Sequence, residues 1–438
     1  MKKTFALLLM CMLILSACGA NGGNKNTADT GNAGNTGGNT EAAKEITIWA
    51  WDPAFNIAAL EVAKAQYTAA NPDVKINIVE YAQNDIIQKL NTGLNSGTTK
   101  GLPNIVLIED YRSQGFLQSY KDSFYDLSNS IKGADFADYK SGPTSLDGKQ
   151  YGIPFDSGVT GLYVRTDYLE QAGYKLSDLQ DITWNDYIEI GKKVKDKTGK
   201  ALITLDPNDL GLIRMMIQSA GSWYLTEDGK TPNIADNAAL KEAFEVYKNL
   251  TDSNVANVHA DWSQFVAALN NGDVASVPTG NWITPSITAA ADQSGKWAVA
   301  PLPKLAGNDK SVHASNLGGS SWYVMNVDGK ETAADFMAKT FGADTEMYQE
   351  LLTDIGVIGT FKAAASGEAY GQANEFFGGQ KVVSDFAAWT EQIPSVNYGV
   401  HTYAIEDILI VEMQNYLNGK AIDKVLSDAQ AQAESQIK

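Results

Sequence analysis

The pattern that most constrains the fold is an alternation of apolar runs and helix-like stretches between residues 46 and 108. Runs rich in branched aliphatic residues at 46–49, 74–78 and 104–108 predict strands. The stretches 57–70 and 85–94 carry apolar residues at three- and four-residue spacing, which predicts helices. Strand, helix, strand, helix, strand at this spacing predicts a parallel sheet in an α/β fold.

Two loops of this region combine aromatic rings with carboxylates. The loop 50–56 follows the first predicted strand and contains Trp51, Asp52 and Asn56, and the loop 109–112 follows the third and contains Glu109 and Asp110. Parallel strands end at one edge of a sheet, where open α/β sheets bind ligands. We therefore expect a site there, although each Asp could instead cap the next helix.

The rest of the chain repeats the α/β pattern without an internal repeat of fixed period. A strand is predicted at 158–165, and amphipathic helices are predicted at 184–197, 210–220, 239–250 and 263–269. These elements predict a second α/β lobe. Further helices are predicted at 333–340, 345–352, 405–416 and 426–437.

Composition excludes several classes of function. The 438 residues include 34 Lys and Arg against 52 Asp and Glu, a formal net charge of −18. This balance argues against nucleic-acid binding and against docking on an anionic membrane through a basic surface. The two cysteines are Cys11 and Cys18, so residues 19–438 can form no disulfide, cysteine zinc site or thiol nucleophile.

The N-terminal segment has the pattern of a targeting signal. Lys2 and Lys3 precede an apolar run at 5–15, which is too short to span a membrane. The following residues 15–18, Leu-Ser-Ala-Cys, resemble the bacterial lipobox, in which cleavage leaves a lipid-modified cysteine at the N-terminus. We expect residues 1–17 to be a signal peptide and Cys18 to carry the lipid. The alternatives are an ordinary secretory peptide and a buried helix with incidental cysteines.

Residues 19–44 are dominated by Gly, Asn, Thr and Ala and contain no aromatic or branched aliphatic residue. Such a stretch cannot bury enough apolar surface to offset its ordering entropy, so 18–44 are expected to be a lipid-anchored, flexible tether. Two acyl chains suffice for stable anchoring. We therefore expect the body to lie on the outer face of the bacterial cytoplasmic membrane.

Several segments, in order, resemble one family. Together they are similar to the family 1 extracellular solute-binding proteins of carbohydrate ABC transporters, the maltose-binding-protein-like group. The matching segments are 46–56, 148–156, 162–167, 184–187, 265–275, 280–282, 297–303 and 316–322. The resemblance covers residues 45–438.

The resemblance implies a fold. It is the α/β, two-lobed periplasmic-binding-protein-like fold (type II), with the ligand in the interlobe cleft. Lobe one would combine 45–154 with 303–359, and lobe two would combine 155–302 with 360–438. The hinge crossings would lie near 154–155, 302–303 and 359–360.

The resemblance also implies which residues contact the ligand. Aromatic rings would stack on the C–H face of a sugar, and polar groups would bond to its hydroxyls. Trp282 resembles the family's stacking tryptophan most clearly. The expected ligand-binding residues are Trp51, Asp52, Asn56, Glu109, Asp110, Asp156, Asp206, Trp223, Tyr224, Asn281, Trp282, Gly318, Gly319, Trp322, Tyr398 and Tyr403. The remaining tryptophans on predicted strands and helices, Trp49, Trp184, Trp262 and Trp297, are expected in the core.

The implied function is capture of a carbohydrate by a monomeric body and its delivery to the permease subunits of an ABC importer. Several tryptophans in loops favour an oligosaccharide. No cofactor, metal ion or catalytic residue is expected. One alternative is a sugar sensor that reports to a membrane kinase. Another is a glycoside hydrolase that uses Asp52, Asp110 and Asp156, although no motif of a metalloprotease, a serine hydrolase or a P-loop enzyme is present.

Overall fold

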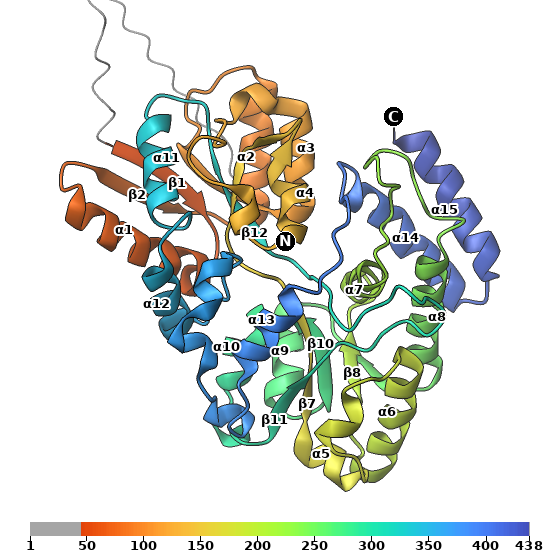
Figure 1. Cartoon of the computed structure of the whole chain (residues 1–438). Coiled ribbons are helices and arrows are strands. Elements are labelled where there is room, and N and C mark those ends of the chain that lie inside the picture. The colour runs from red at the N-terminus through yellow and green to blue at the C-terminus, as the bar shows by residue number, and fades with distance from the viewer. Residues whose placement is uncertain (1–44, 438) are drawn as a thin grey trace, which may run out of the picture. The chain divides into compact units, whose positions relative to one another are not determined.

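The computed structural model describes residues 45–437 (Figure 1). The first of its sheets contains the N-terminal strands of this range. Its strands follow the order β2-β1-β3-β12-β6. β1 pairs in parallel with β2 and β3, whereas β12 runs antiparallel to β3 and β6. The strands are β1 (Glu45–Ala50), β2 (Lys75–Glu80), β3 (Ile105–Glu109), β6 (Gly152–Pro154) and β12 (Ser320–Val324). The predicted parallel α/β arrangement of 46–108 is confirmed.

Helices cover both faces of this sheet (Figure 1). Successive residues of a strand point to opposite faces, and β3 shows this: Ile105 and Leu107 pack with the core around α1 and α11, and Val106 and Ile108 pack with α2 and α3. The helices of this half are α1 (Ala58–Ala70), α2 (Gln83–Asn95), α3 (Asp110–Tyr120), α4 (Ser141–Thr144), α11 (Lys330–Lys339) and α12 (Thr345–Ile355). A short hairpin of β4 (Ser145–Leu146) and β5 (Lys149–Gln150) follows α4.

The second sheet has β7 (Thr160–Arg165) at its centre, antiparallel to both β10 (Ser276–Gly280) and β11 (Trp297–Ala300). A parallel bridge between Ala201 and Val274 links β10 to the pair β8 (Ile203–Leu205) and β9 (Ala256–Val258). As in β3, the two faces of β7 pack into different hydrophobic cores. Tyr163 packs into the core that also contains Ile105 and Leu107, the first core, and Leu162 packs into a second core.

Six of the remaining helices correspond to predicted ones to within a few residues, and the helices at 166–171, 284–288 and 382–390 were not predicted. The remaining helices are α5 (Thr166–Gln171), α6 (Trp184–Thr198), α7 (Gly211–Ser219), α8 (Ala238–Asp252), α9 (Trp262–Asn270), α10 (Thr284–Thr288), α13 (Val382–Thr390), α14 (Thr402–Leu417) and α15 (Ile422–Gln436). None of the helices within 45–437 has the length and apolar character that crossing a membrane requires. The predicted signal peptide, Cys18 and tether lie outside the described residues.

Three chain segments lie side by side between the two sheets. Ser157 N–H donates to the carbonyl of Ile358, Asp156 forms a bridge with Gly359, and Val159 forms a bridge with Asn316. We propose that these segments are the three lobe crossings. Because backbone hydrogen bonds and bridges join them, a change in the backbone of one segment alters its contacts with the others.

The second crossing was predicted at Leu302-Pro303. However, Lys304 N–H donates to the carbonyl of Ile182, and Val312 N–H donates to that of Ser219, next to elements of the second sheet. We therefore propose that this crossing lies later, at 316–320, where the chain enters β12.

Candidate functional site

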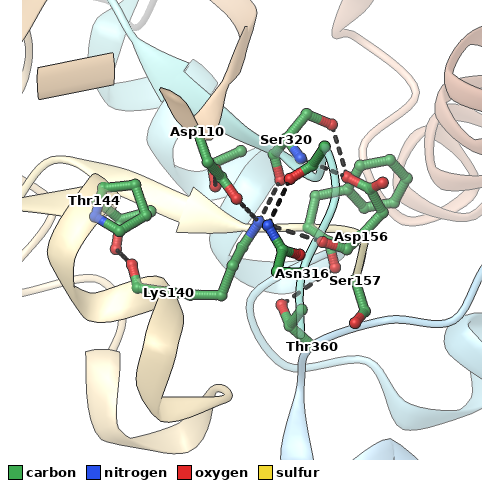
Figure 2. Close-up of polar contacts among 12 residues, drawn as sticks. Asp110, Lys140, Thr144, Asp156, Ser157, Asn316, Ser320 and Thr360 are labelled. Atoms are coloured by element: carbon green, nitrogen blue, oxygen red, sulfur yellow. Dashed lines mark hydrogen bonds and ion pairs between the residues drawn. The ribbon is translucent and has the colours of Figure 1, made fainter. Parts of the chain in front are cut away.

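A buried lysine holds the crossing segments together (Figure 2). Lys140 has no exposed surface, and its ammonium group contacts three oxygens: Asp110 Oδ2 at 2.5 Å, the Ser320 carbonyl at 2.8 Å and the Asp156 carbonyl at 3.1 Å. An ammonium has three N–H donors. Every donor of Lys140 therefore has an acceptor, and two of these acceptors belong to the segments that we propose as lobe crossings.

The two carboxylates predicted here as ligand contacts bond within the protein. Asp110 is fully buried, and its second oxygen accepts from Ser321 Oγ at 2.8 Å. Burial raises the pKa of Asp110, and the Lys140 ammonium opposes that rise. Asp156 Oδ1 accepts from the backbone N–H of Ser320 at 2.7 Å and from its hydroxyl at 2.6 Å. The structure places both side chains at the junction, the region where the three proposed crossing segments meet, and not in the cavity described below.

The predicted Gly318-Gly319 pair lies between these features. Both glycines have positive φ, 78° and 85°, a conformation that a side chain disfavours. A Cβ at Gly319 would lie 3.0 Å from Asp110 Oδ2. The glycine at 319 therefore allows the backbone to approach the buried carboxylate closely.

The loop after β1 holds its predicted residues in an unusual backbone. Asp52 is exposed, has a φ of 62° and accepts from Ala54 N–H at 3.1 Å as a cap. Such a φ costs a non-glycine residue about 1 kcal/mol or more. Trp51 is half-buried against the core, and Asn56 is buried with no hydrogen-bond partner for Oδ1. The loop thus combines backbone strain with an unpaired buried acceptor.

Four predicted aromatic residues lie in or beside one buried cluster. Tyr111, the second residue of α3, stacks on Trp223 at 5.5 Å and meets Tyr398 edge-on at 4.7 Å. Trp223 also contacts Tyr224, with 5.2 Å between ring centroids. Tyr403 lies beside this cluster on α14. Tyr111 was not among the predicted site residues, although it lies in the predicted loop 109–112.

A chain of charged groups continues from this cluster. Buried Arg214 forms two ion pairs, one from Nη1 to Glu406 and one from Nη2 to Asp209 Oδ1 at 3.1 Å. Its guanidinium also lies over the ring of Tyr111, 5.3 Å from the centroid. Burial raises the pKa of Glu406, and Arg214 opposes that rise. Asp209, at the other end of this row of charged groups, is exposed and lines the cavity described next.

Tyr403 connects the two halves of the molecule. Its hydroxyl donates to Glu109 Oε2, at the end of β3, with a distance of 2.6 Å. The guanidinium of Arg112 lies 3.9 Å above its ring. Burial raises the pKa of Tyr403, and neighbouring Glu109 adds to the rise, so the phenol stays protonated and donates at physiological pH.

The aromatic cavity lies at the carboxyl ends of β8 and β10. Trp282 forms one wall, and its indole N–H donates to the Leu317 carbonyl at 2.8 Å. A Cβ at Gly280 would lie 2.1 Å from Trp282 Nε1, so the glycine lets the indole fold over the backbone. Polar and apolar groups share the lining, which includes Thr204, Asp206, Asp209, Met215, His259, Trp262, Phe265, Thr279, Trp282 and Leu317.

The imidazole of His259 also lines the cavity. Burial lowers the pKa of His259, which leaves the ring neutral at physiological pH. Its Nδ1 lies 2.9 Å from the Thr204 hydroxyl. A neutral imidazole can both donate and accept hydrogen bonds, as can a sugar hydroxyl.

Asn281 and Trp322, both predicted ligand contacts, are buried. Neither the amide oxygen nor the amide nitrogen of Asn281 has a hydrogen-bond partner, and its exposed fraction is 2%. Trp322 has no exposed surface and packs against Phe155 and Phe341 in the first core, with centroids 5.3 and 5.4 Å away. The position of Trp322 on a central strand explains its burial.

The core assignment of Trp262 is wrong. Its exposed fraction is 55%, and its ring lies 5.8 Å from that of Trp282. Trp49, Trp184 and Trp297 are buried as predicted. Trp262 shares a helical stripe with Phe265 and the buried Leu269, three and seven residues further on, which is why the sequence indicated the core. Asp261 caps α9 and makes Trp262 its first residue, where the ring lines the cavity instead.

Lys140 and Arg214 were also missed. Their acceptors lie up to 180 and 192 residues away in sequence, and no local pattern marks either residue. No group of three or more His, Cys, Asp or Glu side chains within the described range could hold a metal ion.

Comparison with known proteins shows the family of this chain. The sequence profile of the bacterial extracellular solute-binding proteins matches residues 63–378. The chain is 48% identical over 396 residues to the lactose-binding protein of Rhizobium radiobacter, covering 90% of this chain and 93% of that protein. It is 28% identical over 313 residues to the arabinooligosaccharide-binding protein of Bacillus subtilis (strain 168), covering 68% and 70%.

Solved structures show the same fold. The sugar-binding protein MalE of Xanthomonas citri superposes with a TM-score of 0.73 at 17% identity, covering 89% of this chain and 96% of that one. The galacto-N-biose-/lacto-N-biose I-binding protein of Bifidobacterium longum gives 0.72 at 20% identity, with the same coverage. The fold is therefore the predicted two-lobed α/β fold. The chain belongs to the bacterial extracellular solute-binding protein family.

Proposed function

We propose that this protein binds a β-galactoside disaccharide such as lactose, without chemical change, and delivers it to an ABC importer. The observation that carries the proposal is the cavity under Trp282, where an indole held by a hydrogen bond to Leu317 and the carboxylates of Asp206 and Asp209 line the same space. The galactoside class follows from the relative from Rhizobium radiobacter, a lactose-binding protein 48% identical to this chain.

The cavity has the chemistry that a sugar requires. A pyranose ring has an apolar C–H face, which an indole covers, and a rim of hydroxyls, which carboxylates bind through charge-assisted hydrogen bonds. Trp282 supplies the first surface. Asp206 and Asp209 supply acceptors at the same cavity, and neutral His259 supplies a donor or an acceptor.

Closure of the two lobes completes the binding mechanism. Glu109 and Arg112 belong to the first sheet and α3, whereas Tyr403 belongs to α14 beside the second core. The contact between them forms where these halves meet. A ligand that prefers the closed arrangement shifts the population toward it.

We also propose that Cys18 carries a lipid that holds the protein at the outer face of the cytoplasmic membrane. The complete order of basic, apolar and small residues before Cys18 supports this. Membership of an extracellular solute-binding family agrees with a position outside the cytoplasm. The permease partners and the monomeric state belong to the same proposal.

Hydrolysis is the weaker candidate. Of the three carboxylates that a hydrolase could use, Asp110 bonds to Lys140 and Ser321, and Asp156 bonds to Ser320. An acid and its partner must both face the glycosidic bond, and these two side chains face the junction. The named relatives are binding proteins.

The test is calorimetric titration of the purified protein with lactose, followed by chromatography of the recovered sugar. We expect one site per chain and intact lactose. The Trp282→Ala variant should lose about tenfold or more in affinity, because the stacking surface is removed. Release of galactose and glucose, or heat no different from that of buffer across galactosides, would overturn the proposal.

A further inference from the structure

We infer that Trp262 forms a second stacking surface in the cavity under Trp282 and gives the site a preference for two linked sugar rings over one. The inference rests on the proposed function. It assigns a ligand-binding role to a residue whose sequence position indicated the core.

The exposure of Trp262 is unusual within the described residues. Three large hydrophobic side chains are highly exposed there: Val258 at 74%, Val411 at 59% and Trp262 at 55%. An indole left in water forgoes the stabilisation that burial of its large apolar surface would give. Trp262 is the only one of the three that lines the cavity.

The position of Trp262 is fixed by its helix. Asp261 accepts from Gln264 N–H at 2.9 Å and so caps α9 directly before Trp262. The ring also contacts Phe265, one helical turn on, with 5.5 Å between centroids. Phe265 in turn lies 5.0 Å from the His259 ring. The exposed indole is therefore supported from below and is held in place before a ligand arrives.

The two tryptophans form an angled surface. Their centroids lie 5.8 Å apart, and their planes make an angle of 43°. Two flat platforms that meet at an angle can each hold one ring of a bent, linked pair. A single ring lying on Trp282 leaves the exposed part of Trp262 uncovered, so only a ligand of two or more rings gains from both surfaces.

A protein partner is the other occupant that an exposed tryptophan could have. The shared cavity favours the sugar, because Asp206, Asp209 and His259 line it together with both indoles. These groups provide hydroxyl-binding partners in the same cavity. A contact with a membrane protein would not need them.

The experiment compares the affinities of the full-length protein for lactose and methyl β-galactoside by calorimetry. Trp262→Ala should weaken lactose binding about three- to tenfold and change methyl β-galactoside binding by less than about twofold. Trp262→Phe should retain most of the lactose affinity. Val258→Ser, which removes an exposed apolar side chain in the same stretch but outside this cavity, is the matched control and should bind like wild type.

Three results would overturn the inference: unchanged lactose affinity in Trp262→Ala, an equal loss for both sugars, or an equal loss in Val258→Ser. Wild-type binding of lactose with an unchanged Trp262→Ala variant would leave the proposed function intact. Failure of the wild type to bind either sugar would overturn both. Thermal unfolding of each variant shows that the comparison is made on folded protein, because an exposed side chain contributes little to stability.

Discussion

The ammonium nitrogen of Lys140 lies 2.5 Å from Asp110 Oδ2, and neither side chain has any exposed surface. Removal of one member of such a pair leaves a charge buried without compensation, which costs about 3–5 kcal/mol. Lys140 also binds the carbonyls of Asp156 and Ser320, so the pair connects two of the segments that we propose as lobe crossings.

Lys140→Met should therefore lower the free energy of unfolding by about 3–5 kcal/mol. Chemical denaturation measures the change. The double variant Lys140→Met/Asp110→Leu should recover a large part of the loss, because no isolated charge remains. Lys121→Met, which removes an exposed partner of Asp147, is the control and should change the free energy of unfolding far less, because water screens an exposed ion pair. Equal losses in the Lys140 and Lys121 variants would contradict this account of the junction.

The hydrogen bond from Tyr403 to Glu109 should stabilise the closed arrangement. Tyr403→Phe removes the hydroxyl and keeps the ring under Arg112, at a cost of about 1 kcal/mol. We expect lactose affinity to fall about fivefold, with a faster dissociation rate in stopped-flow measurements. Tyr120→Phe removes a similar bond to Asn95 within the first half of the molecule and should leave affinity unchanged. A Tyr403→Phe variant with wild-type affinity and dissociation rate would show that the contact does not contribute to closure.

Two tryptophans predicted as ligand contacts should separate into different roles. Trp322 is fully buried, so Trp322→Ala should lower the free energy of unfolding by about 3–5 kcal/mol. Its folded fraction should still bind lactose like wild type. Trp282→Ala should show the reverse pattern, with a large loss of affinity and a smaller loss of stability. If the folded Trp322→Ala protein loses more affinity than Trp282→Ala, the assignment of the cavity is wrong.

Acid should weaken one surface contribution in a defined range. Lys149 and the hydroxyl and amide of Ser128 lower the pKa of Asp126 to about 2, from about 4 in an unfolded chain. A lowered pKa stabilises the fold above the unfolded value, and this stabilisation is lost as pH falls from about 4 to about 2. Asp126→Asn should therefore melt below wild type at pH 6, and the difference should shrink toward pH 2. A difference independent of pH would contradict the assigned cause.

Local patterns in the sequence predicted much of the fold. The predicted strand at 46–49 and helix at 85–94 correspond to β1 and α2, because hydrophobic spacing alone distinguishes them. The antiparallel insertion of β12 beside β3 could not be predicted in this way. β3 lies more than two hundred residues before β12 in the sequence, and no local pattern encodes that pairing.

The site was predicted less completely for a related reason. Glu109 and Tyr403 were both predicted as ligand contacts, and the structure brings them into contact with each other. Asp110 has the same sequence features as a ligand-binding carboxylate, and its true partner is Lys140, thirty residues away. Trp262 shows the opposite error, because it lies on the stripe of α9 that contains the buried Leu269 and yet is itself 55% exposed at the first residue of the helix. Side-chain partners of this kind depend on tertiary contacts that composition and periodicity do not contain.

The central claim is that the cavity under Trp282 holds a sugar, and a crystal structure of the lactose complex tests it most directly. The account predicts one pyranose ring against the indole of Trp282, with hydroxyls bonded to Asp206 and Asp209. Intact lactose bound elsewhere, with this cavity empty, would contradict it.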